Sequence, residues 1–218
     1  MLSGSGKNME GVIPLPESSK RAGRGAIDLA WSALEGKDLA VLASNSGSRL
    51  AKDHLLLPFF ESRLTVDFGR RLVLFAGRQA DEATAILALH YLAGCGPEVP
   101  RGVLVPFNQA DGGTAYYEAF KRRTIDRVAK EFGEDPGSLI RAGGVLGGMD
   151  RELGAASIDI RAFPKVRLTL IVWEGDEEIP ASANVLFDSV ALDILDTEDL
   201  AVVGSLTMAR LLKAKAQL

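Results

Sequence analysis

Two neighbouring segments of alternating polar and apolar residues constrain the fold of this chain most strongly. They span residues 157–162 and 166–173, and only Phe163-Pro164-Lys165 separates them. Because successive side chains of a β-strand point to opposite faces, a period of two predicts a β-hairpin with one apolar face. We expect a three-residue turn between the two strands.

The register of this hairpin follows from the same pattern. A three-residue turn pairs Ile160 with Leu168 and Ile158 with Leu170, so the apolar face is continuous. On the polar face Asp159 then lies opposite Thr169 and diagonal to Arg167. A shift of one residue would place Arg161 in the core, so we expect this register to be strongly specified.

Further segments predict a second hairpin and several helices. Alternation on both sides of Gly69-Arg70 predicts strands with a two-residue turn, and residues 55–60 are expected as a third strand that Pro58 confines to a sheet edge. Residues 182–187 are expected as another strand. Helical spacing of apolar residues predicts helices over 25–34, 80–93 and 114–132, a short one from Pro136, and a last one with Thr197 as its N-cap.

Helices and antiparallel hairpins are interleaved without a repeating strand–helix–strand unit, which predicts an α+β fold. We expect a single domain over residues 25–218, with antiparallel hairpins packed against about four or five helices. Residues 1–24 are rich in Gly, Ser, Lys and Arg, and we expect them to form a flexible tail.

The cysteine content excludes several kinds of site. The chain has one cysteine, Cys95, and two histidines, His54 and His90, whereas structural zinc sites and iron–sulfur clusters usually take four Cys or His ligands. We therefore expect neither group to be held by this chain alone. A disulfide framework is impossible and no signal peptide is recognisable, so we expect a cytoplasmic protein.

Charge and hydropathy exclude further classes. The 25 Lys and Arg residues against 29 Asp and Glu give a net charge of −4, which does not favour binding to nucleic acid. No apolar stretch approaches the roughly 18 residues of a membrane span, so no membrane insertion is expected. The oligomeric state cannot be read from the sequence.

The densest group of candidate functional residues follows the predicted strand 166–173. It holds four carboxylates in five residues: Glu174, Asp176, Glu177 and Glu178. Such a loop can direct several oxygens at a divalent cation, with Asp176 and Glu178 as ligands, or offer Glu174, Asp176 or Glu177 as a general base. The alternative interpretation is a solvated acidic turn that separates strand edges.

His90 is a second candidate, because it lies on the apolar stripe Ala83, Ile86, Leu87 and His90 of the predicted helix 80–93. A histidine in such a position can bind a metal or carry a proton. The alternative is a core histidine that is hydrogen-bonded to a backbone carbonyl.

Several segments together resemble one family. They are Leu89-His90-Tyr91-Leu92, Phe107, Gly112-Gly113, Tyr116-Tyr117, Phe120-Lys121-Arg122-Arg123, Gly147-Gly148, Arg161-Ala162-Phe163-Pro164, Trp173-Glu174-Gly175-Asp176-Glu177-Glu178 and Asn184-Val185-Leu186-Phe187-Asp188. In this order they are similar to DUF3786, an uncharacterised family found mostly in anaerobic bacteria and archaea. The resemblance covers roughly residues 25–213, and its most specific part is the stretch from Trp173 to Asp188.

The resemblance strengthens the acidic loop as a candidate, because the loop belongs to the family's most recognisable motif. It also makes Arg161, Asp188, Trp173 and Tyr116 candidate binding residues, with Arg161, Asp188 and His90 expected to converge on the loop. Asp188 has an alternative role as the N-cap of a helix. Some relatives carry an additional four-cysteine iron–sulfur domain, which implies anaerobic redox, corrinoid or one-carbon metabolism and an iron–sulfur or corrinoid protein as partner.

Three hypotheses about function follow. The first is a non-catalytic binding or accessory protein that docks a partner or holds a cofactor of unknown identity. The second is a metal-assisted enzyme in which the acidic loop Glu174–Glu178 meets His90 or Arg161 in one pocket. The third is a structural subunit without a site of its own.

Overall fold

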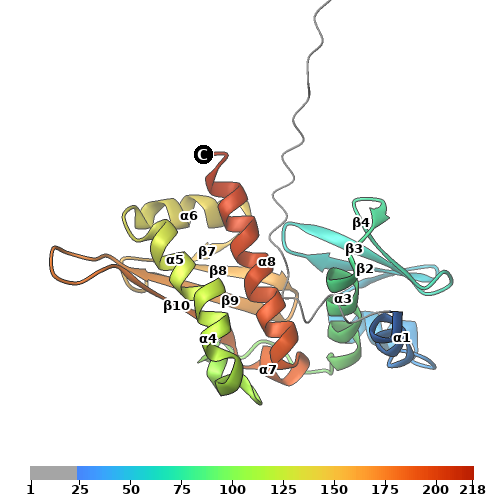
Figure 1. Ribbon diagram of the computed structural model, residues 1–218. Helices are drawn as coiled ribbons and strands as arrows, with labels where there is room; N and C mark the ends of the chain where they lie inside the picture. The colour runs from blue at the N-terminus through green and yellow to red at the C-terminus, as the bar shows by residue number, and fades with distance from the viewer. Residues whose placement is uncertain (1–23) are drawn as a thin grey trace, which may run out of the picture.

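The computed structural model describes residues 24–218, so the predicted tail lies outside the described residues apart from Arg24. The α+β class is confirmed. Two five-stranded antiparallel sheets are combined with helices, and the two sheets lie side by side (Figure 1). None of the described helices has both the length and the apolar character needed to cross a membrane.

The helices are α1 (Arg24–Ser32), α2 (Leu39–Ser46), α3 (Glu82–Gly94), α4 (Gly113–Arg123), α5 (Ile125–Phe132), α6 (Pro136–Val145), α7 (Val190–Ile194) and α8 (Thr197–Lys215), with a short 3₁₀ helix at Phe107–Gln109. The strands of the first sheet, in spatial order, are β1 (Arg49–Ala51), β2 (His54–Phe59), β3 (Ser62–Asp67), β4 (Leu72–Phe75) and β5 (Arg78–Gln79). Those of the second sheet, again in spatial order, are β6 (Leu104–Pro106), β10 (Ser182–Asp188), β9 (Val166–Trp173), β8 (Ala156–Phe163) and β7 (Met149–Asp150).

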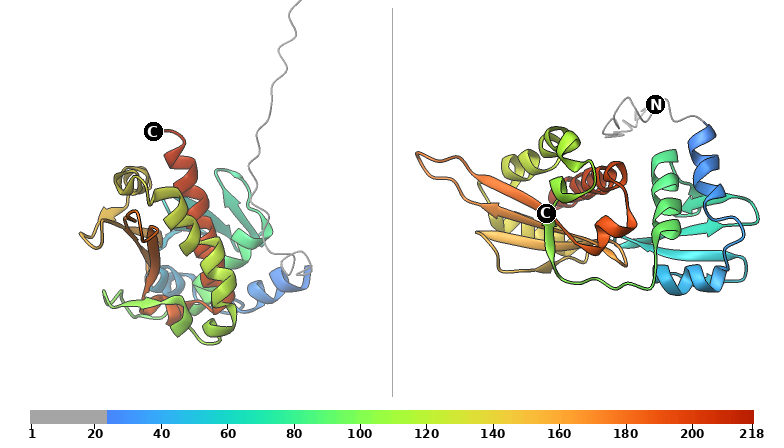
Figure 2. Two further views of the ribbon diagram at one scale, coloured as in Figure 1. Left: turned by 60° about the vertical axis from the view of Figure 1, so that its left-hand side comes forward. Right: turned by 90° about the horizontal axis from the view of Figure 1, so that it is seen from below.

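The second sheet has one face covered by helices. Helices α5, α6 and α8 pack on the face that carries Ile158, Ile160, Leu168 and Leu170, all of which are buried. The right-hand view of Figure 2 shows these helices on one side of the sheet. The opposite face carries the polar residues of β8 and β9, because alternate side chains of a strand point away from each other.

The predicted register of β8 against β9 is confirmed by the pairs Ile158–Leu170, Asp159–Thr169 and Ile160–Leu168. The turn differs from the prediction. Phe163 pairs directly with Val166, which leaves a two-residue turn, and an irregularity between Arg161 and Phe163 takes up the extra residue as a β-bulge.

The first sheet confirms the pairs Leu64–Phe75 and Val66–Val73. The expectation that Pro58 confines β2 to an edge is wrong, because β2 lies between β1 and β3. Pro58 is accommodated because β1 pairs with β2 only as far as Leu56, so no neighbour on that side requires the missing N–H at position 58.

Two predicted helix boundaries are wrong, and one helix was not predicted. The expected helix 114–132 is interrupted at Thr124, whose backbone leaves the helical region and whose hydroxyl donates to the carbonyl oxygen of Phe120 at 2.6 Å. The N-cap of α8 is Asp196 rather than Thr197. Helix α2 was missed, although Asp38 caps its first N–H groups and Gly47 ends it with a φ of 69°. Because α2 is additional and Thr124 divides one expected helix into two, the number of helices in the described residues exceeds the expected four or five.

A continuous core joins the two sheets. The Tyr91 ring of α3 stacks on Phe163 of β8 with 4.4 Å between ring centroids, and Phe163 in turn contacts Phe59 of β2 at 5.0 Å. The Tyr91 hydroxyl donates to the carbonyl oxygen of Ser46 and accepts from the N–H of Lys165. These contacts hold α2, α3, β2 and β8 together, and they satisfy the polar end of a fully buried tyrosine.

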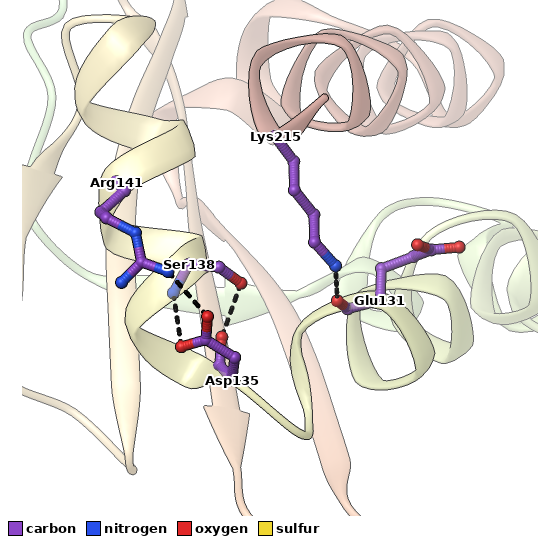
Figure 3. A network of polar contacts seen from close by, with 5 residues as sticks. All are labelled: Glu131, Asp135, Ser138, Arg141 and Lys215. Atoms are coloured by element: carbon purple, nitrogen blue, oxygen red, sulfur yellow. Dashed lines mark hydrogen bonds and ion pairs between the residues drawn. The ribbon is translucent and has the colours of Figure 1, made fainter. Parts of the chain in front are cut away.

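Figure 3 shows two sets of polar contacts, one within the N-terminal part of α6 and one that joins α8 to the last turn of α5. Asp135 caps α6 by accepting from the N–H of Ser138, and it accepts from the Arg141 guanidinium at 2.7 Å. The Lys215 ammonium of α8 donates to the carbonyl oxygen of Glu131 in the last turn of α5. These bonds satisfy backbone groups that the helix ends leave free.

The cap predicts a measurable loss of stability on substitution. Asp135→Ala removes the acceptor for the first turn of α6 and should lower the free energy of unfolding by about 1 kcal/mol. Urea denaturation measures this change. The neighbouring substitution Glu134→Ala, at an exposed position, is the matched control and should change the free energy by less than about 0.5 kcal/mol. Equal losses in both variants would contradict the assigned cap.

Candidate functional site

The candidate site is a cavity on the helix-free face of the second sheet. Two loops, residues 100–102 and residues 151–154, lie over this face, and a hollow of about 400 Å³ is found there. Its lining consists of Pro100, Arg101, Gly102, Leu104, Arg151, Asp159, Arg167, Thr169 and Asp188. Three of these residues are arginines and two are aspartates.

Both aspartates are almost fully buried and have their own donors. Asp188, which is 3% exposed, accepts from the N–H groups of Gly102 at 2.7 Å and of Arg101 at 3.1 Å, and also from the N–H of Val190 at 3.1 Å. The alternative role of Asp188 as a helix N-cap is not met, because the N-cap of α7 is Ser189, although Asp188 accepts the N–H of Val190 in the first turn. Because a buried carboxylate needs such partners, Asp188 also holds the loop 100–102 against the sheet.

Asp159 is the second buried carboxylate, at 8% exposure. It accepts from the hydroxyl of Thr169, its register partner on β9, and the Nε of Arg151 lies 3.5 Å from its other oxygen. The hydroxyl and the guanidinium therefore compensate this charge within the wall of the cavity.

The loop 151–154 approaches the sheet closely. A Cβ on Gly154 would lie 2.6 Å from the carbonyl oxygen of Val172, and Gly154 has a φ of 63°. Only glycine fits there without displacing the backbone. The N–H of Leu153 donates to the Ser157 hydroxyl at 2.8 Å, so this wall of the cavity is tied to β8.

Arg167 differs from the other charged residues of the cavity. Its Nε is shielded from solvent and has no hydrogen-bond partner among residues 24–218. Its register partner is Arg161, a like charge, and within the same residues no carboxylate lies within 4 Å of either guanidinium. Like charges directly opposite on a sheet repel, and a buried donor without an acceptor costs free energy. An anion bound against the part of the Arg167 side chain that lines the cavity would offset the repulsion between the two guanidinium groups.

The acidic loop does not join this cavity. All its carboxylates are exposed, and Glu174 and Asp176 border a separate hollow beside Lys130 of α5. The pKa of Asp176 is lowered because its carboxylate accepts the N–H groups of Ile179 and Glu178, as in a local turn. The described residues that line this second hollow do not include His90, Arg161 or Asp188, so the expected convergence is absent and the geometry favours a solvated turn.

The remaining candidate binding residues lie apart from one another. Trp173, at the end of β9, is 42% exposed and Tyr116, on α4, is 49% exposed. Arg161 is exposed beside the cavity but does not line it. Of the four candidates only Asp188 is part of the lining.

His90 lies at the junction of α3 and α8. The expectation that it faces inward on an apolar stripe is only partly met, because its side chain is half-buried and the fully buried positions of α3 include Ala88, Leu89 and Leu92. Its partner is a carboxylate rather than a backbone carbonyl: Nδ1 lies 2.7 Å from an oxygen of Asp199. This hydrogen bond raises the pKa of His90, and burial raises the pKa of Asp199.

Cys95 is buried at the end of α3, and burial raises the pKa of its thiol to about 11. The thiolate, which is the reactive form, is therefore scarce at neutral pH. A structural cysteine, rather than a nucleophile, follows from this environment.

Sequence reasoning paired Asp159 with Thr169 but did not identify them as site residues. The predicted register could have indicated a site on this face, because it places Arg161 and Arg167 on the same face as Asp159 and Thr169. For Arg101, Gly102 and Arg151 there was no signal, because the loops that carry them are positioned by distant residues such as Asp188.

The His90–Asp199 pair predicts a pH dependence of stability. The raised pKa of His90 means that its contribution is complete below the ordinary value of about 6.5 and is lost as the pH rises through the higher pKa of the folded state. The raised pKa of Asp199 acts in the same direction. The melting temperature should therefore fall as the pH rises above the ordinary histidine value of about 6.5, and His90→Gln should flatten this decline. Parallel pH profiles of wild type and variant would contradict the pairing.

Comparison with known families gave a match over most of the chain. The model of the family described as "Domain of unknown function (DUF3786)" matches residues 38–210, which include both sheets and the whole lining of the cavity. Neither the curated proteins nor the solved structures gave a match. Because the match spans more than half of its length, the chain belongs to the DUF3786 family.

Proposed function

We propose that this chain is a binding or accessory protein that holds a small anionic molecule, with a carboxylate or phosphate group, in the cavity on the second sheet. The observation that carries the proposal is Arg167, which lines the cavity, lies opposite the like charge of Arg161, and has no carboxylate within 4 Å among residues 24–218. A guanidinium is planar and always charged, and it binds carboxylates and phosphates through paired N–H groups.

The charge balance of the lining supports an anion. Arg101, Arg151 and Arg167 face two carboxylates that already accept hydrogen bonds from the protein. Arg101 is also paired with Asp193 of α7 at 3.0 Å. The positive charge that remains available in the cavity is therefore centred on Arg167.

The size of the cavity also supports a small ligand. Its volume of about 400 Å³ lies in the lower part of the range of roughly 300–1,000 Å³ that is typical of small-molecule sites. The lining includes neither His90 nor Cys95, and its one hydroxyl, on Thr169, already donates to Asp159. Binding is therefore better supported than catalysis, and no specific observation favours an enzyme built on the acidic loop.

The biological setting is part of the same proposal. Anaerobic redox, corrinoid or one-carbon metabolism, an iron–sulfur or corrinoid protein as partner, and a cytoplasmic location are what the sequence and the resemblance imply, and they stay predictions.

The test is calorimetric titration of the protein with inorganic phosphate and, separately, with malonate. Loss of a charged hydrogen-bond donor costs about 1.5–3 kcal/mol. Arg167→Gln should therefore weaken the affinity for whichever of the two anions binds more tightly by about tenfold or more. Arg161→Gln, the register partner outside the lining, is the matched control and should weaken it by less than about threefold. The absence of binding of either anion to the wild type, or equal losses in both variants, would contradict the proposal.

A further inference from the structure

A second group of ionisable side chains lies on the first sheet, remote in sequence from the anion cavity. Asp53 lies in the tight turn between β1 and β2, where Lys52 has a φ of 59°, and His54 begins β2. Asp67 ends β3 and is the register partner of His54. The turn and the pairing of β2 with β3 therefore bring one imidazole and two carboxylates to the same corner of the sheet.

The three side chains are close enough to share an ion. The Nδ1 of His54 lies 3.0 Å from an oxygen of Asp53 and 3.9 Å from an oxygen of Asp67, and one donor atom from each residue lies within 4.8 Å of the other two. Zinc bonds of about 2.0–2.2 Å place tetrahedral ligand atoms about 3.4 Å apart. The observed separations lie on both sides of this value.

The direction of the His54 ring is the second observation. Nδ1 is shielded from solvent and makes no hydrogen bond within the described residues, although an oxygen of Asp53 is only 3.0 Å away. A ring nitrogen bonds in the plane of the ring, so this contact fails on angle rather than on distance. Nδ1 is therefore directed past the Asp53 carboxylate, as expected of a nitrogen that coordinates an ion between the acids.

The two carboxylates meet beside a glycine. A Cβ on Gly69 would lie 3.4 Å from Asp53 Oδ2 and 3.5 Å from Asp67 Oδ1, so the oxygens converge on the space that the missing side chain leaves. Asp67 is only 5% exposed, and it accepts the N–H of Arg70 at 2.9 Å. The Arg70 side chain is largely exposed and lies 3.9 Å away, so it compensates the buried charge weakly.

We propose that Asp53, His54 and Asp67 form a binding site for Zn²⁺, with His54 Nδ1 and one oxygen of each carboxylate as ligands and a fourth position open to water. Imidazole combined with carboxylates suits zinc and its neighbours in the transition series better than magnesium or calcium, which prefer oxygen ligands alone. The site does not depend on the anion cavity, because the two share no residue.

The cluster of His90, Asp196 and Asp199 provides an internal control. Its donor atoms are similarly close, but His90 Nδ1 is already hydrogen-bonded to Asp199 at 2.7 Å. Asp196 is engaged as the N-cap of α8, where it accepts the N–H of Asp199 at 2.9 Å. One carboxylate of each cluster accepts a backbone N–H, but a metal would have to displace the His90–Asp199 hydrogen bond, whereas His54 Nδ1 makes no hydrogen bond among the described residues, so zinc should prefer the cluster at His54.

The first experiment uses the fact that the chain has two histidines. The Cε1–H resonances of His54 and His90 in the untagged protein are followed by NMR during titration with Zn²⁺ and assigned with His90→Gln. The His54 resonance should move and reach saturation at one equivalent, while that of His90 stays in place. Movement of the His90 resonance alone, or of neither, would overturn the proposal.

The second experiment measures the affinity for Zn²⁺ by calorimetry. Asp53→Asn changes an exposed ligand and should weaken binding by more than about tenfold without unfolding the protein. Asp199→Asn, in the control cluster, should change the affinity by less than about twofold. The opposite order of the two effects would place the metal at the other cluster and refute the assignment. Neither result bears on phosphate binding, so this proposal and the proposed function fail separately.

Discussion

The register of β8 against β9 is the constraint on which the candidate site depends. Burial of Ile158, Ile160 and Leu168 under α5, α6 and α8 leaves Asp159, Arg161 and Arg167 on the other face of the sheet. A shift of one residue would exchange the two faces and bury charged groups against the helices. That exchange would cost several kcal/mol for each charge, so the hydrophobic face fixes the position of the polar one.

The polar face in turn determines what covers it. Asp159 and Asp188 are buried although they lie on the side without helices, and each requires polar partners. The loop 100–102 gives Asp188 the backbone N–H groups of Arg101 and Gly102, and the Arg151 side chain adds an ion pair to the hydrogen bond that Asp159 accepts from Thr169 within the sheet. The cavity is the space that these two loops enclose, and Arg167 is the group within it that they leave without an acceptor.

How far the sequence predicts this architecture depends on the range of the interactions. The alternation of residues 157–173 specifies the β8–β9 register, and the cap of α6 follows from Asp135 and Pro136, because these signals are local. The β-bulge near Ala162 was not predictable in this way. The N–H of Phe60, directly after β2 of the first sheet, donates to the carbonyl oxygen of Ala162. The bulge therefore lies where β8 contacts the other sheet. Asp188 contacts Arg101 across a sequence separation of 87 positions, and His90 contacts Asp199 across 109. No local sequence pattern predicts either contact.

The central claim is that Arg167, within its cavity, is the anion-binding group. The most direct measurement is the ¹H–¹⁵N NMR spectrum of the arginine Nε–H groups with and without inorganic phosphate, with the Arg167 signal assigned by its loss in Arg167→Gln. We expect this signal to move downfield and to exchange more slowly with water when phosphate binds, while that of Arg161 changes little. A spectrum in which Arg161 and other exposed arginines respond to phosphate and Arg167 does not would contradict the account.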